Sequence, residues 1–457
     1  MNKAALDSWF EQNREAILAD YCELLRFPTI GAEREHLPDC TACAEWIARF
    51  LGSLGFTTEL VSASAELPPV LIAERPVPNA PHTVLLYGHY DVQPVDPIEL
   101  WETPPFEPTL RNGRLYARGA QDDKGQWFAL LQGLRAAIAA GESLPAIRIV
   151  LEGQEESGSG ALADLAYDLR KRLAADVLLV ADTGKDPSGR PAIVAGLRGV
   201  LHFTVTLRGP KYDLHSGQHG GIAPNPAQGI AELVASLHTP DGAIAVEGFC
   251  DGIVEPTEAE FALATEPGFD ENAYRAEVGV LPVGGERGVP AIVRNAFRPT
   301  VEVNGIHGGY GGPGSKTVIP THAFAKLSCR LVPGQNPVHV WECLKAHFER
   351  HCPRGLTLEL TELTGCEPGF RLPIDSPVTR IAHDLLNTFD PRGAVFTWEG
   401  ASIPIVAKLR DLTGAAPLLV GFGTQEDRIH CPNESFSLEQ FRDGMRWGAQ
   451  IFPAFGA

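Results

Sequence analysis

The chain has no uninterrupted apolar run of about 18 residues, the minimum that a membrane-spanning helix needs. Its N-terminal segment, MNKAALDSWFEQNREAILADYCELL, also lacks a continuous apolar core and predicts an amphipathic helix instead of a secretory signal. Positive charge is scarce as well, because 38 Lys and Arg face 57 Asp and Glu, a formal net charge of -19. We therefore expect a soluble, cytoplasmic protein that binds neither membranes nor nucleic acids.

Cysteine usage gives no sign of a disulfide framework. Nine cysteines, an odd number, are scattered along the chain, which favours reduced thiols. The one close pair, Cys40 and Cys43, falls in DCTACAEWIARFL, where the pattern predicts the first turns of an amphipathic helix. No second pair of cysteines completes a zinc or redox site.

Glycine-rich phosphate-binding loops are missing too. The segment GSGALADL follows a predicted strand, but it has neither the Walker lysine nor the spacing of a dinucleotide-binding loop. A nucleotide-binding α/β protein is therefore disfavoured.

What the sequence does contain is an alternation of strands and helices over its first two hundred residues. Predicted helices at about 124–140 and 161–173 separate three apolar strands, which are Thr83–His89, Ala146–Gly153 and Asp176–Asp182. Apolar strands that alternate with helices indicate an α/β fold with a mostly parallel sheet, covered on both faces. In such sheets ligands bind beyond the carboxyl ends of the strands.

From about Gly196 the pattern changes. The segment GVLHFTVTLRG alternates strictly, as a half-exposed strand does, and further strands and helices suggest an α+β module. The later segments IPIVAKLRDLTG and APLLVGFG resume the first pattern. We therefore predict a catalytic domain at 1–196 and 398–457, interrupted by an inserted domain at 197–397, in line with a prior of roughly 150 residues per domain.

Acidic and imidazole side chains gather where the first strands end. They are His89 and Asp91 in YGHYDVQP, Asp122 and Asp123 in ARGAQDDKG, Glu155 and Glu156 in EGQEESGSG, Asp182 in VADTG and His430 in EDRIHCPNE. Imidazole and carboxylate ligands without thiolates suit zinc, manganese or cobalt. At least five candidates converge, which favours two ions bridged by a shared carboxylate.

The adjacent carboxylates of Glu155 and Glu156 repel each other, so their pairing needs a reason. If a divalent ion takes one as a ligand, the repulsion is offset and the other is held as a general base beside a metal-activated water. His89 and Asp91 are two residues apart on a strand end and point to one face. Asp91 can therefore fix the tautomer of the imidazole.

Each motif has a simpler interpretation. The paired glutamates could complement a helix dipole, the paired aspartates could cap the following helix, and the first histidine could be an ordinary buried side chain. Asp182 could be a turn residue before Gly184. Because all of these residues fall at strand ends of one predicted sheet, we favour the metal site.

At these residues the sequence resembles the M20 family of metallopeptidases, which includes carnosinase-like dipeptidases, carboxypeptidase G-type enzymes, and acetylornithine and succinyl-diaminopimelate deacylases. The resemblance extends from about Arg26 to the C-terminus. It implies a zinc-peptidase-type catalytic domain with two divalent ions per subunit, zinc in the first place and manganese or cobalt as alternatives. One ion would be held by His89 and Asp182, the other by Glu156 and His430, with Asp122 bridging them.

The resemblance also implies roles beside the metals. Glu155 would be the general base and Asp91 the partner of His89, and the peptide bond between Asp122 and Asp123 would be cis. A non-catalytic, regulatory relative of the family would have lost the base. The presence of Glu155 together with every ligand argues against that alternative.

The family's inserted domain is a lid that also forms a homodimer. In it, GPKYDLHSGQHGG matches the motif whose histidine, here His215, acts in trans on the developing oxyanion of the partner's active site. The segments GGPGSKTVIP, AKLSCRLVP and EGASIPI resemble the dipeptidase branch. They imply that Arg330 binds the substrate's carboxylate, and that Ser402 and Thr317 or Lys316 line the same pocket. His215 as an exposed loop residue, and Arg330 as a strand-surface cation, are the alternatives.

These observations predict a metallopeptidase that hydrolyses the amide bond of dipeptides or short peptides with a free C-terminal carboxylate, using Glu155 as the base. The rival is an N-acyl amino acid amidohydrolase. After Asp182 the segment TGKDPSG does not match the dipeptidase branch. The resemblance implies that this segment faces the region where the amino end of a dipeptide is read. The amino-side specificity therefore stays open between the two.

Overall fold

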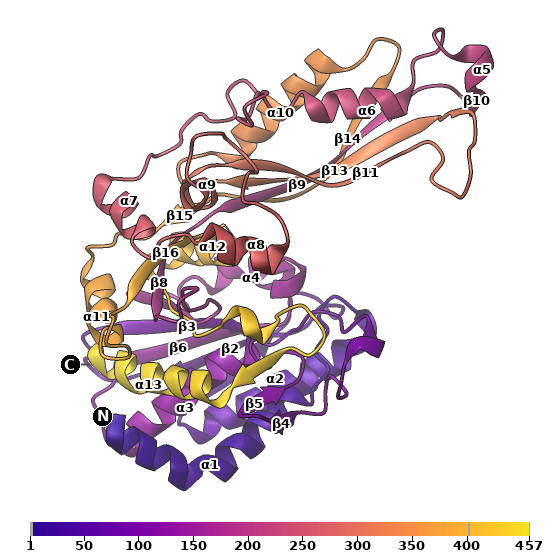
Figure 1. Cartoon of the computed structure of the whole chain (residues 1–457). Helices are drawn as coiled ribbons and strands as arrows, with labels where there is room; N and C mark the ends of the chain where they lie inside the picture. Colours follow the sequence, from indigo (N-terminus) through magenta and orange to yellow (C-terminus); the bar gives the residue numbers. More distant parts are fainter. Residues whose placement is uncertain (1–2, 401–402, 457) are drawn as a thin grey trace. The chain divides into compact units, whose positions relative to one another are not determined.

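The protein is described by a computed structural model that covers residues 3–400 and 403–456 (Figure 1). Ser402, predicted to line the substrate pocket, lies outside the described residues. The chain forms two compact units. The first consists of Met1–Ala195, Leu372–Thr397 and Ile405–Ala457, and the second of Gly196–Arg371 and Trp398–Pro404.

A six-stranded sheet forms the centre of the first unit. Its strands, in spatial order, are β1 (Thr57–Val61), β2 (Val70–Arg75), β6 (Ala146–Glu152), β3 (Thr83–His89), β7 (Val177–Val180) and β17 (Ala416–Leu419). The last four are parallel, whereas β2 is antiparallel to both of its neighbours. The four residues of β7 and the last six of β3 are buried, as expected for strands covered on both faces. The predicted α/β fold with a mostly parallel sheet is confirmed.

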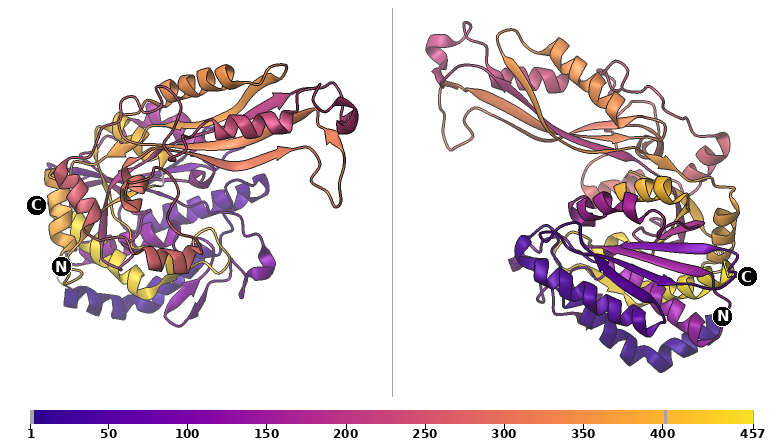
Figure 2. Two further views of the ribbon diagram at one scale, coloured as in Figure 1. Left: turned by 45° about the horizontal axis from the view of Figure 1, so that its top comes forward. Right: turned by 180° about the vertical axis from the view of Figure 1, so that it is seen from behind.

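Helices cover both faces of this sheet (Figures 1 and 2). One face carries four of them, which are α1 (Lys3–Leu25), α2 (Leu37–Ser53), α3 (Lys124–Ala139) and α13 (Leu438–Ala454). The other face carries α4 (Gly160–Leu169) and α12 (Pro404–Thr413), where Lys408 Nζ donates to the carbonyl oxygen of Ala163 at 2.7 Å. The two helical layers bury the apolar strands between them.

A small antiparallel sheet in the first unit joins two distant parts of the chain. It contains β4 (Thr109–Arg111), β5 (Arg114–Tyr116) and β18 (Ser435–Ser437). Ser435 pairs with Tyr116, and Ser437 pairs with Arg114. This register aligns the segment that follows His430 with the segment that leads to Asp122.

The second unit contains a four-stranded antiparallel sheet, in the order β11 (Thr300–Gly308), β13 (His322–Leu331), β9 (Gly199–Arg208) and β14 (Thr357–Glu367). One face of β9 supplies Leu201, Phe203, Val205 and Leu207 to the core. The core is completed by α6 (Pro226–Ala235) and α10 (Pro337–His351), which contribute Ile230, Leu233, Val340, Leu344 and Phe348. On the opposite face of β9, His202 and Arg208 are exposed, whereas Val200 and Thr204 are buried, so the predicted alternation holds only in part.

Shorter elements complete both units. They are β8 (Ala192–Leu197), β10 (Leu214–His215), β12 (Val318–Ile319), β15 (Phe370–Arg371), β16 (Val395–Glu399), α5 (Ser216–His219), α7 (Glu258–Thr265), α8 (Glu271–Val278), α9 (Ala291–Phe297) and α11 (Pro377–Leu386). None of the helices within the described ranges is long and apolar enough to span a membrane.

One predicted domain boundary differs from the structure. The sequence predicts a return to the first domain at residue 398, but residues 372–397 already belong to the first unit, and Trp398–Pro404 belong to the second. The reason is helix α11, which packs against α13 and β17. Both partners lie far downstream, so the local sequence of the helix did not reveal where it would pack.

Candidate metal centre

Five of the predicted ligands form two adjoining clusters in the first unit. His89, Asp122 and Asp182 place one ligand atom each within 4.8 Å of one another, and so do Asp122, Glu156 and His430. Asp122 belongs to both clusters. Its Oδ1 lies 3.2 Å from Nε2 of His89, and its Oδ2 lies 2.9 Å from Nε2 of His430. The shared carboxylate therefore has the position that a bridging ligand requires.

The parallel strands explain why these residues meet. His89 is the last residue of β3, Glu156 follows β6 in a short 3-10 helix (Glu155–Ser157), and Asp182 follows β7. Because β6, β3 and β7 are neighbours in the sheet and end at the same edge, their terminal residues converge. Asp122 lies just before α3, and its peptide bond to Asp123 is cis, as the resemblance implied.

Asp91 holds both the imidazole and the paired glutamates. Its Oδ1 lies 3.3 Å from Nδ1 of His89, and both side chains are completely buried. Its carboxylate also accepts the backbone N–H groups of Glu155 and Glu156, at 3.2 and 3.1 Å. Asp91 thus fixes the backbone of the two adjacent glutamates, in addition to orienting the histidine.

The charge balance of the cluster fits a divalent metal. Hydrogen bonds to Asp122 and Glu156 raise the pKa of His430 to about 10. Burial by itself would raise the pKa of Asp122, but a hydrogen bond from His430 and the charge of the nearby His89 imidazole hold it below its ordinary value. In the absence of a metal, protons on the imidazoles therefore balance the carboxylates. A divalent cation replaces these protons with a stronger positive charge.

A second observation points the same way. Nε2 of His89 is buried and makes no hydrogen bond of normal geometry with any residue that the structure describes. Its other ring nitrogen faces Asp91, so Nε2 is the atom left for a ligand. A donor set of two imidazoles and three carboxylates, without thiols, suits zinc, manganese or cobalt.

Glu155 lies beside the predicted ligands, and its pKa is shifted in the opposite direction to that of Asp122. Burial raises the pKa of its carboxyl group well above the ordinary value, and the neighbouring carboxylates of Asp182, Glu156 and Asp122 act in the same direction. A carboxyl group in this environment takes up a proton more readily than an exposed glutamate does. This is the property that a general base and proton carrier needs.

Gln93 is a contact of the cluster that the sequence did not reveal. Its Nε2 donates to Oε2 of Glu156 at 2.7 Å, and the same oxygen lies 3.3 Å from Nε2 of His430. Gln93 therefore helps to orient the carboxylate of Glu156 within the cluster. The residue stands in the same motif as His89 and Asp91, but a single amide side chain gives no chemical signal of its own.

The family comparison agrees with this geometry. The model of Peptidase family M20/M25/M40 matches residues 85–453. The chain belongs to this peptidase family. The Cys-Gly metallodipeptidase dug1 of Schizosaccharomyces pombe is 28% identical over 470 residues, which cover 97% of this M20 chain and 97% of the relative. The human Beta-Ala-His dipeptidase is 30% identical over 397 residues, covering 85% and 78% respectively.

A solved structure gives the same result for the fold. The M20 family metallo-carboxypeptidase Sso-CP2 from Sulfolobus solfataricus superimposes with a TM-score of 0.86 at 30% sequence identity, over 96% of this chain and 99% of the other. The M20 assignment of the sequence analysis is therefore confirmed.

The remaining predicted residues of the M20 chain lie in its second unit. His215 is exposed, and its Nδ1 accepts the backbone N–H of Gly217 at 3.0 Å. The strand pair β10–β12 aligns His215 with Val318, next to the exposed Thr317 and Lys316. Arg330 lies in β13 opposite Thr300 of β11, and burial lowers its pKa. His215 and Thr317 are thus brought together by the strand pairing.

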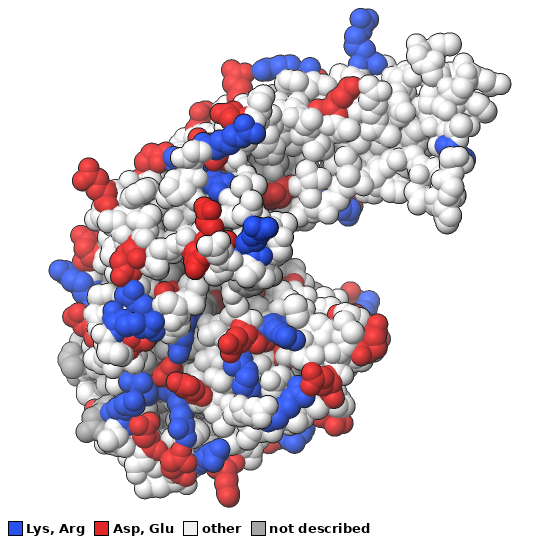
Figure 3. Space-filling view, in the orientation of Figure 1, with Lys and Arg blue, Asp and Glu red and all other residues white. Residues whose placement is uncertain are grey.

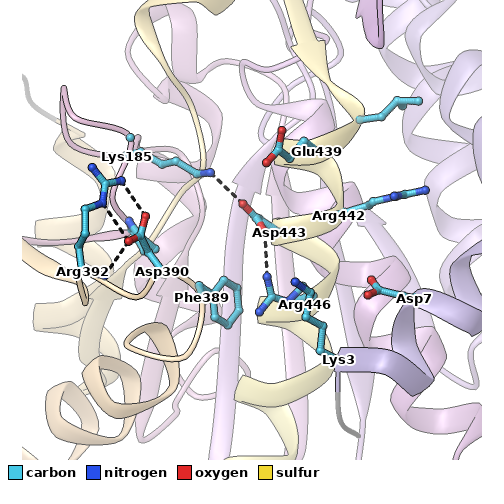
Figure 4. Close-up of a pocket in the computed structure, with 13 residues that line it drawn as sticks. Lys3, Asp7, Lys185, Phe389, Asp390, Arg392, Glu439, Arg442, Asp443 and Arg446 are labelled. Atoms are coloured by element: carbon cyan, nitrogen blue, oxygen red, sulfur yellow. Dashed lines mark hydrogen bonds and ion pairs between the residues drawn. The ribbon is translucent and has the colours of Figure 1, made fainter.

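The first unit also contains a polar cavity of about 740 Å³ whose lining includes none of the predicted site residues (Figure 4). Charged side chains from α1, α13 and two loops surround it. Lys185 and Arg446 both contact Asp443, at 2.8 and 3.3 Å, and Arg392 contacts Asp390 at 2.7 Å. Opposite charges therefore pair with one another in this cavity.

Proposed function

We propose that this M20 peptidase hydrolyses the amide bond of dipeptides or short peptides that carry a free C-terminal carboxylate. The observation that carries the proposal is the pair of ligand clusters that share Asp122, with the half-buried carboxyl group of Glu155 beside them. His89 and Asp182 would hold one divalent ion, Glu156 and His430 a second, and Asp122 both. Zinc is the proposed metal.

Glu155 performs the proton transfers. Bound divalent ions supply Lewis acidity, which acidifies water and polarises the substrate carbonyl. Glu155 accepts the proton of the attacking water and then donates it to the nitrogen of the leaving amine. The backbone bond from Glu155 to Asp91 keeps this carboxyl group in place between the two transfers.

The second unit supplies the proposed contacts to the rest of the substrate. Arg330 binds the terminal carboxylate with its two-pronged guanidinium group, and Thr317 or Lys316 and Ser402 line the same pocket. His215 donates to the developing oxyanion in the partner subunit of a homodimer.

Features of the second unit support the proposed homodimer. On the face seen in Figure 3, the end of the unit that carries α5 and β10 shows few charged side chains. Tyr212, Ile222 and Ile306 are exposed to 70%, 80% and 53%. Exposed apolar residues in a charge-poor region are typical of a protein interface.

The names of the relatives, Cys-Gly metallodipeptidase and Beta-Ala-His dipeptidase, support a dipeptide as the substrate. All nine cysteines are free thiols, which supports the proposed location in the cytoplasm.

The segment after Asp182 favours an N-acyl amino acid amidohydrolase as the second candidate. Both carboxylate oxygens of Asp186 accept from the hydroxyl group of Ser188, and Oδ1 also accepts from the backbone N–H of Arg190. This carboxylate is buried and engaged, so it is not available to a substrate ammonium group. An uncharged acyl group has no need of such an acceptor.

A panel of free dipeptides, C-terminally amidated dipeptides and N-acyl amino acids separates the candidates. Metal-stripped protein restored with zinc or manganese is expected to cleave the free dipeptides, with the products identified by mass spectrometry. Arg330→Ala is expected to raise KM for free dipeptides by about 10- to 100-fold, the range of one charge-assisted contact, and to leave amidated peptides unchanged. Cleavage of N-acyl amino acids alone would favour the second candidate. No cleavage in any class by the metal-loaded protein would refute both.

A further inference from the structure

Glu434 is a completely buried carboxylate whose acceptor sites are filled by the loop that carries Asp122. Its Oε1 accepts the backbone N–H groups of Gln121 and Asp122, at 3.0 and 3.2 Å. Its Oε2 accepts the backbone N–H of Gly119 at 3.0 Å and Nη1 of Arg118 at 2.8 Å. A carboxylate offers about four lone-pair positions, so these four donors use them all.

The small sheet explains how Glu434 reaches this loop. Ser435 of β18 pairs with Tyr116 of β5, and the pairing continues one step, because Ala117 N–H donates to the backbone oxygen of Glu434 at 3.2 Å. The side chain of Glu434 then meets the residues that follow Ala117. Four residues before Glu434 stands His430, so one short segment carries both a proposed ligand and the anchor of another.

Arg118 extends the connection to a third segment. One arm of its guanidinium group binds Glu434, and Nη2 donates to the backbone oxygen of Pro94 at 3.0 Å. Pro94 is the last residue of the motif that contains His89, Asp91 and Gln93. The buried pair of Arg118 and Glu434 thus ties together three segments that bear proposed ligands.

We propose that Glu434 is a positioning residue of the metal centre, which holds the loop of Asp122 in register with the segment of His430. The inference rests on the proposed function, because it assigns both residues as metal ligands. Glu434 is too occupied by backbone N–H groups to be a ligand itself. Its effect on a metal is indirect, through the placement of the bridging carboxylate.

A simpler role for Glu434 is to neutralise Arg118, which is also buried. The two roles differ in what they require of the side chain. Neutralisation needs only a negative charge near Arg118, whereas positioning needs both oxygens at the four donors. Glu434→Asp keeps the charge but retracts the carboxylate, so it separates the two roles.

The first test is the metal affinity of Glu434→Gln, measured without substrate by competition with a chelator and by the visible spectrum of the cobalt-loaded protein. Glutamine keeps one acceptor oxygen and places an NH₂ group against the other donors. The affinity for the metal is expected to fall by about 10- to 100-fold, the usual effect of losing a residue that supports a ligand, with an altered cobalt spectrum. Unchanged affinity and spectrum, within twofold of wild type, would overturn the inference.

The matched control is Glu260→Gln in the second unit. Glu260 is also a buried carboxylate, 6% exposed, and it pairs with Arg371 at 3.3 Å. Its loss is expected to lower Tm without changing metal affinity. Equal losses of metal affinity in both variants would show that a buried charge matters only for folding, and would contradict the positioning role.

Two further variants keep the inference testable if Glu434→Gln does not fold. Glu434→Asp is expected to recover Tm but not the metal affinity, and full recovery of both would favour simple neutralisation. Arg118→Lys keeps the charge but loses the second arm of the guanidinium group, which donates to the backbone oxygen of Pro94. Roughly tenfold weaker metal binding is expected. Wild type that binds two ions but cleaves no peptide would refute the proposed substrate, while these affinities still decide the role of Glu434.

Discussion

Two polar regions of the first unit, the cluster of predicted metal ligands and the cavity beside α13, differ in how their charges are balanced. In the cavity, Lys185 and Arg446 pair with Asp443, and Arg392 pairs with Asp390 (Figure 4). In the cluster, several carboxylates lie close together, and the imidazoles are the positive groups that offset their charge. A polar hollow by itself therefore does not mark a reaction site. An excess of one charge, held in place by the fold, is the better sign.

The largest difference between the two regions is expected when the proposed general base of the cluster is removed. Glu155→Gln is expected to lower kcat by about a thousandfold, within the range for a group that transfers protons in the transition state, while the metal affinity is kept. Steady-state kinetics on the best substrate of the panel, with metal content measured on the same sample, checks this. In the cavity, Glu439→Gln serves as the control and is expected to leave kcat unchanged. Retention of activity in Glu155→Gln would assign the base elsewhere.

Loss of the shared ligand is expected to abolish stabilisation by metal. A ligand present at 100 times its Kd stabilises the native state by about 2.7 kcal/mol. Zinc added to chelator-treated wild type should therefore raise Tm, whereas Asp122→Ala should show little or no rise, because both clusters lose a ligand. Differential scanning calorimetry with and without zinc measures the shift. An equal rise in both proteins would place the metal at another site.

The pH dependence of the metal-free protein sharpens the comparison. The folded-state pKa of His430, about 10, exceeds the ordinary value of 6.5. The resulting stabilisation is fully present below about pH 6.5 and is lost as the pH rises through 10. The difference in urea midpoint between wild type and His430→Gln should therefore shrink from pH 6 to pH 10.

Metal binding should follow the opposite trend, because the ion competes with the proton on His430 and affinity increases as the proton leaves. The controls are metal titrations of wild type at pH 6 and pH 8. A gap in urea midpoint that stays constant with pH would contradict the proposed coupling of His430 to the carboxylates.

The smallest effect is expected in the cavity. Asp443→Asn removes the partner of Lys185 and Arg446, whose ion pairs are only partly exposed, and is expected to cost about 1 kcal/mol of stability. The metal affinity and kcat should stay at wild-type values. A loss of activity with normal stability would mean that the cavity contributes to the reaction after all.

Much of the fold could be predicted from local patterns of apolar residues in the sequence. The apolar segments that became β3, β6 and β7 are short, nearly continuous and followed by turn residues, so their position in a buried parallel sheet was predictable. Residues 372–397, predicted to belong to the inserted domain, lie in the first compact unit because α11 packs on partners far along the chain.

The candidate site, like the fold, was predictable where local patterns in the sequence determine it. His89, Glu156 and Asp182 follow neighbouring strands, so the sheet itself brings them together, and the structure places Asp122 and His430 with them. The roles of Gln93 and Glu434 could not be predicted from the sequence. Each role depends on contacts between one side chain and backbone or ligand atoms that are distant in the sequence. Such contacts depend on strand register, above all that of β5 with β18.

The pairing of β17 with β7 has a consequence for synthesis on the ribosome. When β7 emerges, its partner strand and His430 are still untranslated, since the whole of Gly196–Arg371 comes first. At roughly 5–20 residues per second, the nascent sheet waits on the order of ten seconds or more with an open edge. Of the proposed ligands, His430 is made last, so the proposed metal site would be completed only after β17 has been translated.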